Sequence, residues 1–138
     1  MDLQKRAALI ERILTLQTSP DTMPVVSLKA FFDGNDDLGS IGCNLPEHPG
    51  VQRFYSVLSA IKARSDVQDV LVEIHEIVDD ETSWPFADTV YILTAAGTSA
   101  VHEWVADLQP DEVADGFRHP PGAPSLLPGM RPVHVWWD

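Results

Sequence analysis

The fold of this chain is decided by the stretch that runs from Val70-Leu71-Val72-Glu73-Ile74-His75-Glu76-Ile77 through an acidic connection to Thr89-Val90-Tyr91-Ile92-Leu93-Thr94. β-Branched and aromatic residues dominate both runs, as is typical of strands. Successive side chains of a strand point to opposite faces, so Val70, Val72 and Ile74 share one face while Glu73 and His75 share the other. Pro85 in the connection has no N–H to donate to a ladder. The stretch therefore predicts an antiparallel hairpin.

The residues before the hairpin predict a helix, a strand, a loop and a second helix. The first helix covers Leu3–Leu16, and the strand covers Val25–Phe32. Asp33–Gly50 is a long glycine-rich loop, and loops of this length are often functional. The second helix starts near Pro49. The apolar stripe of the first helix is Leu3, Ala7, Ile10 and Leu14. That of the second helix is Val51, Phe54, Tyr55, Leu58 and Ile61.

After the hairpin we expect a third helix, a short turn, an irregular segment and a last strand. The helix starts after Gly97, with a stripe of Val101, Trp104, Val105 and Leu108. Pro110 opens the turn and Gly116 ends it. The proline-rich residues 119–132 should lack regular structure. Val133–Trp137 is the strand.

This order of elements predicts an α+β fold in one domain of residues 1–138. The arrangement is that of a ferredoxin-like (split βαβ) four-stranded antiparallel sheet with an added N-terminal helix. A chain of 138 residues is long enough to bury a core without metals or disulfides.

Composition indicates a cytoplasmic protein. The chain has one cysteine, Cys43, which cannot form an internal disulfide and so favours a reducing compartment. Charges interrupt the N-terminal apolar residues, which argues against a signal peptide, and no apolar run is long enough to span a bilayer.

Charge is distributed unevenly along the chain. The formal net charge is −12, yet residues 66–115 contain thirteen acids and no Lys or Arg, while the remainder nets +1. Such a segment would repel nucleic acid and anionic membranes and attract a basic partner. The alternative is that the acids only keep the protein in solution.

Alternate positions of the predicted strands would line the sheet face that the helices leave open. A small-molecule ligand could bind there, or Glu73 could orient His75 as an acid–base pair. The alternative is a face that water or the N-terminal helix covers. The predicted set is Ser27, Lys29, Glu73, His75, Tyr91, His134 and Trp136.

Other motifs point to no chemistry. The five histidines lack paired spacing, so we expect no metal and no cofactor. Asp33, Asn35 and Asp37 imitate part of a calcium loop, but Gly39 comes one place late and Asn44 replaces the bidentate Glu. We identify no catalytic residue.

The connection of the hairpin forms a second candidate site. Trp84 and Phe86 next to the acids Asp79, Asp80 and Glu81 would give a partner protein an apolar anchor with a charged rim. In the alternative, at least one ring folds back onto the sheet.

Two segments, 31–44 (FFDGNDDLGSIGCN) and 84–94 (WPFADTVYILT), resemble small bacterial cytosolic proteins of the immunity-protein kind. The resemblance covers about a quarter of the chain and implies a binding role. We therefore expect a non-catalytic, acidic interaction protein that masks a basic surface such as that of a toxin. The alternative is a small-molecule enzyme or ligand-binding domain that uses Glu73, His75, Tyr91 and His134.

Overall fold

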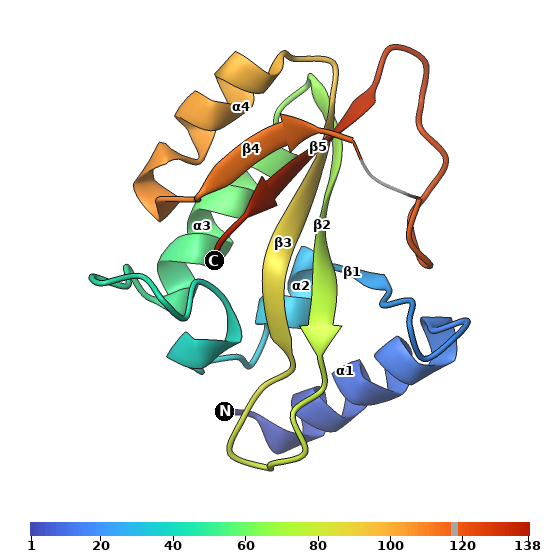
Figure 1. The fold of residues 1–138 in the computed structure, drawn as a ribbon, viewed down its shortest axis with the longest axis vertical. Coiled ribbons are helices and arrows are strands. Elements are labelled where there is room, and N and C mark those ends of the chain that lie inside the picture. The colour runs from blue at the N-terminus through green and yellow to red at the C-terminus, as the bar shows by residue number, and fades with distance from the viewer. Residues whose placement is uncertain (117–118) are drawn as a thin grey trace.

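The computed structural model describes residues 1–116 and 119–138, which form one antiparallel sheet of order β1-β2-β3-β5-β4 with helices against it (Figure 1). In Figure 1, α2 and α3 lie behind the sheet. The elements are α1 (Leu3–Leu16), β1 (Val25–Ser27), α2 (Leu28–Phe32), η1 (Leu38–Ser40), α3 (Val51–Lys62), β2 (Val67–Glu76), β3 (Phe86–Thr94), α4 (Thr98–Trp104), η2 (Ala106–Leu108), β4 (Glu112–Asp115) and β5 (Arg131–Trp136).

The predicted hairpin is confirmed. β2 and β3 pair antiparallel, with Val72 opposite Val90, and the ladder shifts register near Glu73 and Glu76. One side of the hairpin is the core face. Val70, Val72, Ile74, Val90 and Ile92 are all buried there, together with Val133 and Val135 of β5. Burying these side chains supplies much of the hydrophobic stabilisation, at ~1.5–3 kcal/mol for each.

The α+β class is confirmed, but the sheet has five strands and not the four of the predicted ferredoxin-like plan. In a split βαβ unit the strands that a helix joins run parallel. Here β1 and β2, which α3 separates in the chain, are antiparallel neighbours. The added strand is β4, where we predicted a turn between Pro110 and Gly116. Its backbone pairs with the outer edge of β5, with Val113 opposite Val135.

The strand predicted over Val25–Phe32 was wrong beyond Ser27. The Ser27 hydroxyl accepts a hydrogen bond from the Ala30 N–H at 3.1 Å and so caps α2. Leu28 and Phe31 then point into the core at helical spacing. A sequence of alternating apolar residues fits a helix turn here because Leu28, Phe31 and Phe32 are also three and four residues apart.

The buried stripe predicted for the first helix was also wrong. Leu9 and Ile13 are the buried residues of α1, at 3% and 0% exposed, whereas Leu3 and Leu14 are 57% and 58% exposed. The helix carries two apolar stripes at helical spacing, and packing chose the other one. In the second helix, α3, the prediction is confirmed, since Val51, Phe54, Leu58 and Ile61 are buried.

The loop predicted over Asp33–Gly50 is fixed by internal hydrogen bonds. Buried Asn35 donates to the Ser40 hydroxyl at 2.9 Å and accepts from the Asp37 N–H. His48 Nε2 lies 2.7 Å from the Ile41 carbonyl, while its Nδ1 accepts from the Gly50 N–H. The loop also contains η1. Side chains therefore satisfy backbone groups that no strand or helix pairs.

The segment that follows residue 118 covers part of the sheet face opposite the helices. The Pro121 carbonyl accepts from the Val25 N–H at the edge strand, and Ala123 packs against a small cluster of Val25, Leu71 and Leu93. The rest of this face, which that segment does not cover, carries polar and aromatic side chains. Among the described residues, no helix has the length and apolar character needed to cross a membrane.

Candidate functional site

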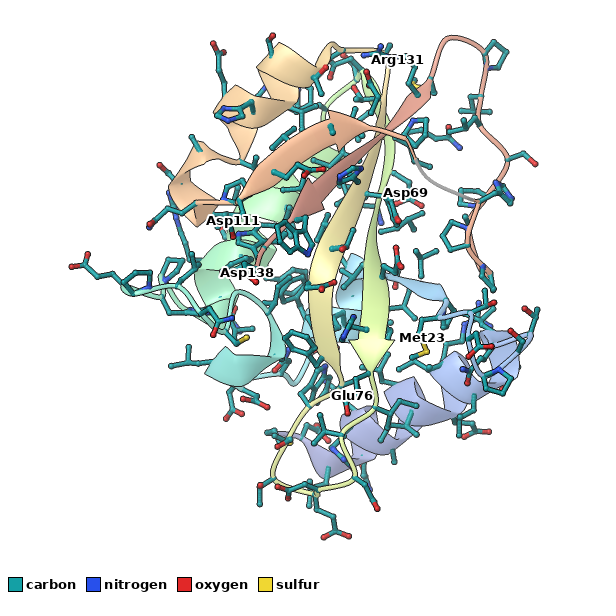
Figure 2. The ribbon with its side chains drawn as sticks, viewed as in Figure 1. Met23, Asp69, Glu76, Asp111, Arg131 and Asp138 are labelled. Carbon is teal, nitrogen blue, oxygen red and sulfur yellow. The ribbon has the colours of Figure 1, made fainter. Side chains whose placement is uncertain are left out.

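The uncovered part of the sheet face brings together most of the residues predicted for a ligand site. Cross-strand pairing places Tyr91 of β3 opposite His134 of β5, and Thr89 opposite Trp136. Glu73 of β2 lies opposite Thr89. Figure 2 shows this face with its side chains, with Asp69 labelled near the start of β2 and Glu76 at its end. We call the set Glu73, His75, Asp88, Tyr91, Glu112, His134 and Trp136 the open face.

A tyrosine–carboxylate pair lies at the centre of the open face. The Tyr91 phenol and the Glu73 carboxylate lie close enough for each group to shift the pKa of the other. Burial raises the pKa of Glu73 above its ordinary value, and the nearby Asp88 charge adds to the shift while Tyr91 opposes it. Burial and then the Glu73 carboxylate raise the pKa of the Tyr91 phenol. Tyr91 therefore stays protonated and acts as a hydrogen-bond donor.

His134 belongs to a second pair on the same face. Its Nε2 lies 2.7 Å from Oε1 of Glu112, and because an ionised carboxylate only accepts, Nε2 carries the proton. Glu112 comes from β4, diagonal to His134 in the ladder. The pair thus depends on the strand that we predicted as a turn.

His75 is not oriented by Glu73, contrary to the acid–base pair considered from the sequence. Its Nδ1 lies 3.6 Å from Oδ2 of Asp88, which is too long for a hydrogen bond. The imidazole is exposed and stands edge-on to Phe86, with ring centroids 5.4 Å apart. No proton relay from Glu73 through His75 exists in this arrangement.

Lys29 was wrongly placed on the open face. Because β1 ends at Ser27, Lys29 lies in α2 and its ammonium belongs to a groove beside α1. Ser27 remains in the sheet, opposite Leu71, but its side chain is exposed at the edge strand. Among the described residues, no group of three His, Cys, Asp or Glu side chains is placed to hold a metal ion.

The candidate site at the hairpin connection is only partly as predicted. Asp79, Asp80 and Glu81 are exposed and Phe86 is partly buried, but Trp84 is only 1% exposed and belongs to the core. The expectation that Trp84 anchors a partner is therefore wrong, because water and partners cannot reach the ring. Its indole N–H finds no hydrogen-bond partner among the described residues.

Arg6 of α1 holds the acidic connection in place. Its guanidinium donates to the carbonyls of Ser83 at 2.8 Å, Asp80 at 2.9 Å and Val78 at 3.2 Å. Such a contact joins residues more than seventy positions apart, so spacing in the sequence gives no signal of it. The connection is a fixed projection of the fold.

Bases from outside the acidic segment neutralise part of its charge. Among the described residues, four of its acids lie within 4 Å of an Arg or Lys: Asp66 by Arg64, Asp69 by Lys62, Asp107 by Arg53, and Asp115 by Arg131. Glu76, Asp79 and Glu81 have no basic partner among the described residues and are exposed. Three uncompensated acids therefore lie together at the hairpin end of the open face.

Sequence reasoning missed two members of the open face, Asp88 and Glu112. Both are acids at the margins of short apolar runs, next to Thr89 and Val113. The change from polar Glu112 to apolar Val113 was the available signal. The run Glu112–Asp115 has only four residues, which is too few to distinguish a strand from a turn.

Comparisons with known proteins give a family. The model of the Uncharacterized protein YfbO family matches residues 4–135. Uncharacterized protein YfbO of Escherichia coli strain K12 is 37% identical over 124 residues, which cover 87% of each chain. This relative agrees with the bacterial character that the resemblance implied. Neither description names an activity, so membership of the immunity-protein kind stays a prediction. No solved structure matches the chain.

Proposed function

The chain belongs to the YfbO family of uncharacterized proteins, and from that premise we propose that it is a non-catalytic binding protein whose open face receives a basic partner protein. Tyr91 and Trp136 supply the contact area and Glu73, Asp88 and Glu112 the complementary charge. The proposal moves the predicted binding site from the Trp84 ring to the sheet.

One observation carries this proposal. Tyr91 and Trp136 remain partly accessible on a sheet face against which none of the described helices packs, whereas Val90 and Val135, their neighbours on the core face, are fully buried. Tyrosine and tryptophan dominate binding energy at protein interfaces, where they offer a large apolar area and a polar tip. A sheet of this kind can leave one face to solvent, but that face is then mostly polar.

The charge around the open face supports a basic partner. Glu73, Asp88 and Glu112 lie among the aromatic rings, and the unpaired acids Glu76 and Glu81 follow at the hairpin end. Acids in this position would accelerate encounter with a positive surface, and salt would weaken that effect. A cytoplasmic role as an immunity protein, with the basic surface of a toxin masked on the open face, fits this charge.

Small-molecule binding or catalysis at the same face is the weaker candidate. The tyrosine–carboxylate pair would suit a polar ligand. However, the best-formed hollows of the described residues lie around α1, α2 and α3, and Tyr91, His134 and Trp136 do not line them. Small ligands bind mostly in concave sites that bury most of their surface, so a flat face favours a macromolecule.

The proposal is tested by retrieval of a partner from native lysate with affinity-tagged protein at low salt. Wild-type protein should retain a stoichiometric basic protein, and salt should release it. Trp136→Ala and Glu112→Lys should each weaken retention at least tenfold, since hot-spot truncations cost about 2 kcal/mol or more.

Glu103→Lys is the matched control. It makes the same change of charge on α4, where Glu103 is exposed and has no bonded partner among the described residues, so retention should be unchanged. Failure to retain any partner, from the lysate or among the products of neighbouring genes, would contradict the proposal. Equal loss with Glu103→Lys would assign the binding to net charge and not to the open face.

A further inference from the structure

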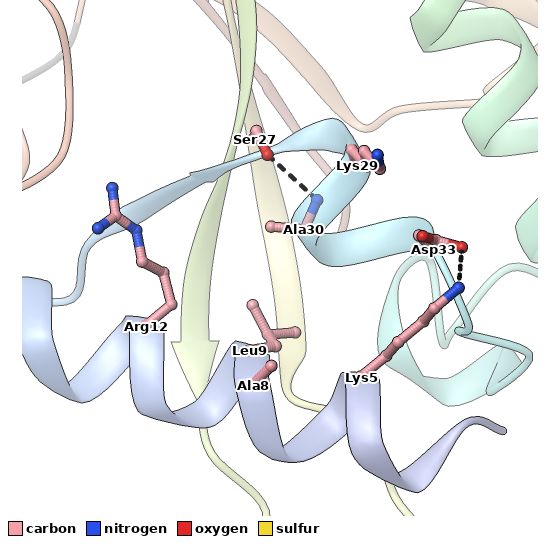
Figure 3. Close-up of a pocket in the computed structure, with 8 residues that line it drawn as sticks. All are labelled: Lys5, Ala8, Leu9, Arg12, Ser27, Lys29, Ala30 and Asp33. Carbon is pink, nitrogen blue, oxygen red and sulfur yellow. Dashed lines mark hydrogen bonds and ion pairs between the residues drawn. The ribbon is translucent and has the colours of Figure 1, made fainter.

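We propose that the groove between α1 and α2 binds a small organic anion that has one carboxylate or phosphate head and a short apolar tail. The groove has a volume of about 320 Å³ and is lined by Lys5, Ala8, Leu9, Arg12, Ser27, Lys29, Ala30 and Asp33. Figure 3 shows Arg12 and Lys5 rising from α1 on either side of Ala8 and Leu9, with Ser27 and Ala30 across the gap. This site is separate from the open face and does not depend on the function proposed there.

Charge is the first argument for an anionic ligand. The whole chain carries −12 and has only nine Lys and Arg residues, yet three of these nine line this one groove. With Asp33 as the single acid, the groove has a formal charge of +2. An acidic protein whose scarce cations meet in one hollow presents a local attraction for anions that its net charge opposes elsewhere.

Arg12 is the residue best placed to hold the head. It forms no hydrogen bond or ion pair with any of the described residues, whereas Lys5 is bound to Asp33 at 2.8 Å. The planar guanidinium can donate two parallel hydrogen bonds to a carboxylate or phosphate. Ser27 lies on the opposite wall, and since its Oγ accepts from Ala30, its own proton is available to the same head.

The floor of the groove suits an apolar tail. Ala8, Leu9 and Ala30 lie there, and the two alanines leave the space that a larger side chain would fill. A second hollow of about 240 Å³ adjoins it and shares Arg12, Ser27 and Ala30, and its one acid, Asp69, is paired with Lys62 at 3.8 Å. The head would therefore lie at Arg12, where the two hollows meet, and the combined size falls in the range of small-ligand sites.

Asp33 limits the ligand to one anionic end. The Lys5 ammonium and the Lys29 charge lower the pKa of the Asp33 carboxyl, so it is ionised at neutral pH. A second anionic group at that end of the groove would meet this carboxylate. A ligand with one anionic head and an apolar tail should bind, and one with an anionic group at each end should not.

Titration of the full isotope-labelled chain with hexanoate and with hexyl phosphate, followed by NMR, tests the site. Saturable shifts at the amides of Ala8, Arg12, Ser27 and Ala30 are expected for at least one of the two, and the tighter ligand identifies the head group. Acetate, inorganic phosphate and hexanol lack either the tail or the charge and should bind at least tenfold more weakly. Adipate, with a carboxylate at each end, should also bind weakly.

Arg12→Gln should weaken binding at least tenfold, and Ala8→Phe should fill the floor and do the same. Both positions are exposed on α1, so folding should be unaffected. Arg53→Gln removes one positive charge from α3, away from both hollows, and serves as the control that should bind as wild type. The proposal is overturned if neither probe gives saturable shifts in the groove, if hexanol binds equally well, or if Arg12→Gln binds as tightly as wild type.

Discussion

The two faces of the central hairpin are built from alternate residues of the same strands, and they have opposite fates. Val70, Val72 and Ile92 pack against the helices without solvent contact. Their neighbours Glu73 and Tyr91 lie close together on the other face and remain partly accessible. Backbone geometry alone separates the two sets, since the period of a strand is two. One face therefore holds the fold, and the other is available for binding.

Adjacent tryptophans at the end of β5 give the sharpest test of this comparison. Trp137 is buried against Phe54 and donates its indole N–H to the Leu108 carbonyl at 2.8 Å, whereas Trp136 lies on the open face. Trp137→Ala should cost about 3–5 kcal/mol and Trp136→Ala about 1 kcal/mol, measured by urea denaturation. Similar losses at both positions would mean that the open face also carries the fold.

Arg6 extends the test to the connection between the two strands. Arg6→Gln removes the donor to three carbonyls and should cost about 1–3 kcal/mol, with faster amide hydrogen exchange over residues 78–83. Arg12→Gln is the matched control, because Arg12 makes no bond with the described residues and should be neutral. Unchanged exchange after Arg6→Gln would show that the connection holds its shape without α1.

Replacement of Glu73, in contrast to that of Arg6, should stabilise the protein at neutral pH. The folded pKa of Glu73 lies above the ordinary 4.5, so the fold favours the protonated form. The free energy that this group contributes to folding is therefore fully present at low pH and is lost as pH rises through the raised pKa of Glu73. Glu73→Gln, which stays neutral, should raise the melting temperature slightly at pH 7, and the difference should vanish below about pH 4. A variant that melts lower than wild type at pH 7 would show that the carboxylate itself stabilises the face.

Salt should have the smallest effect. Repulsion among exposed acids at the hairpin end would be screened, so moderate salt should raise the melting temperature by about 2 °C. The gain is limited because salt also weakens the four ion pairs that neutralise the acidic segment. A lower melting temperature in salt would indicate that these pairs outweigh the repulsion.

Prediction from sequence succeeded where a single local pattern had one interpretation. The hairpin, α3 and the approximate position of β5 follow from apolar spacing. It failed where two patterns coincided. Leu28–Phe32 fits both a strand and a helical turn, and α1 offers two stripes, of which Leu9 and Ile13 were buried. For the open face, Glu73, His75, Tyr91 and His134 were placed on the correct side, but the neighbouring acid Asp88 and the His134 partner Glu112 were missed.

The sequence by itself determined which residues alternate across the hairpin and that the acids cluster between positions 66 and 115. Only the tertiary structure decided that Trp84 is buried, that Arg6 fixes the acidic connection, and that Lys29 joins Arg12 beside α1. The reason is the range of the forces involved. Strand alternation is set by neighbouring residues, whereas burial and the meeting of charges depend on segments far apart in the chain.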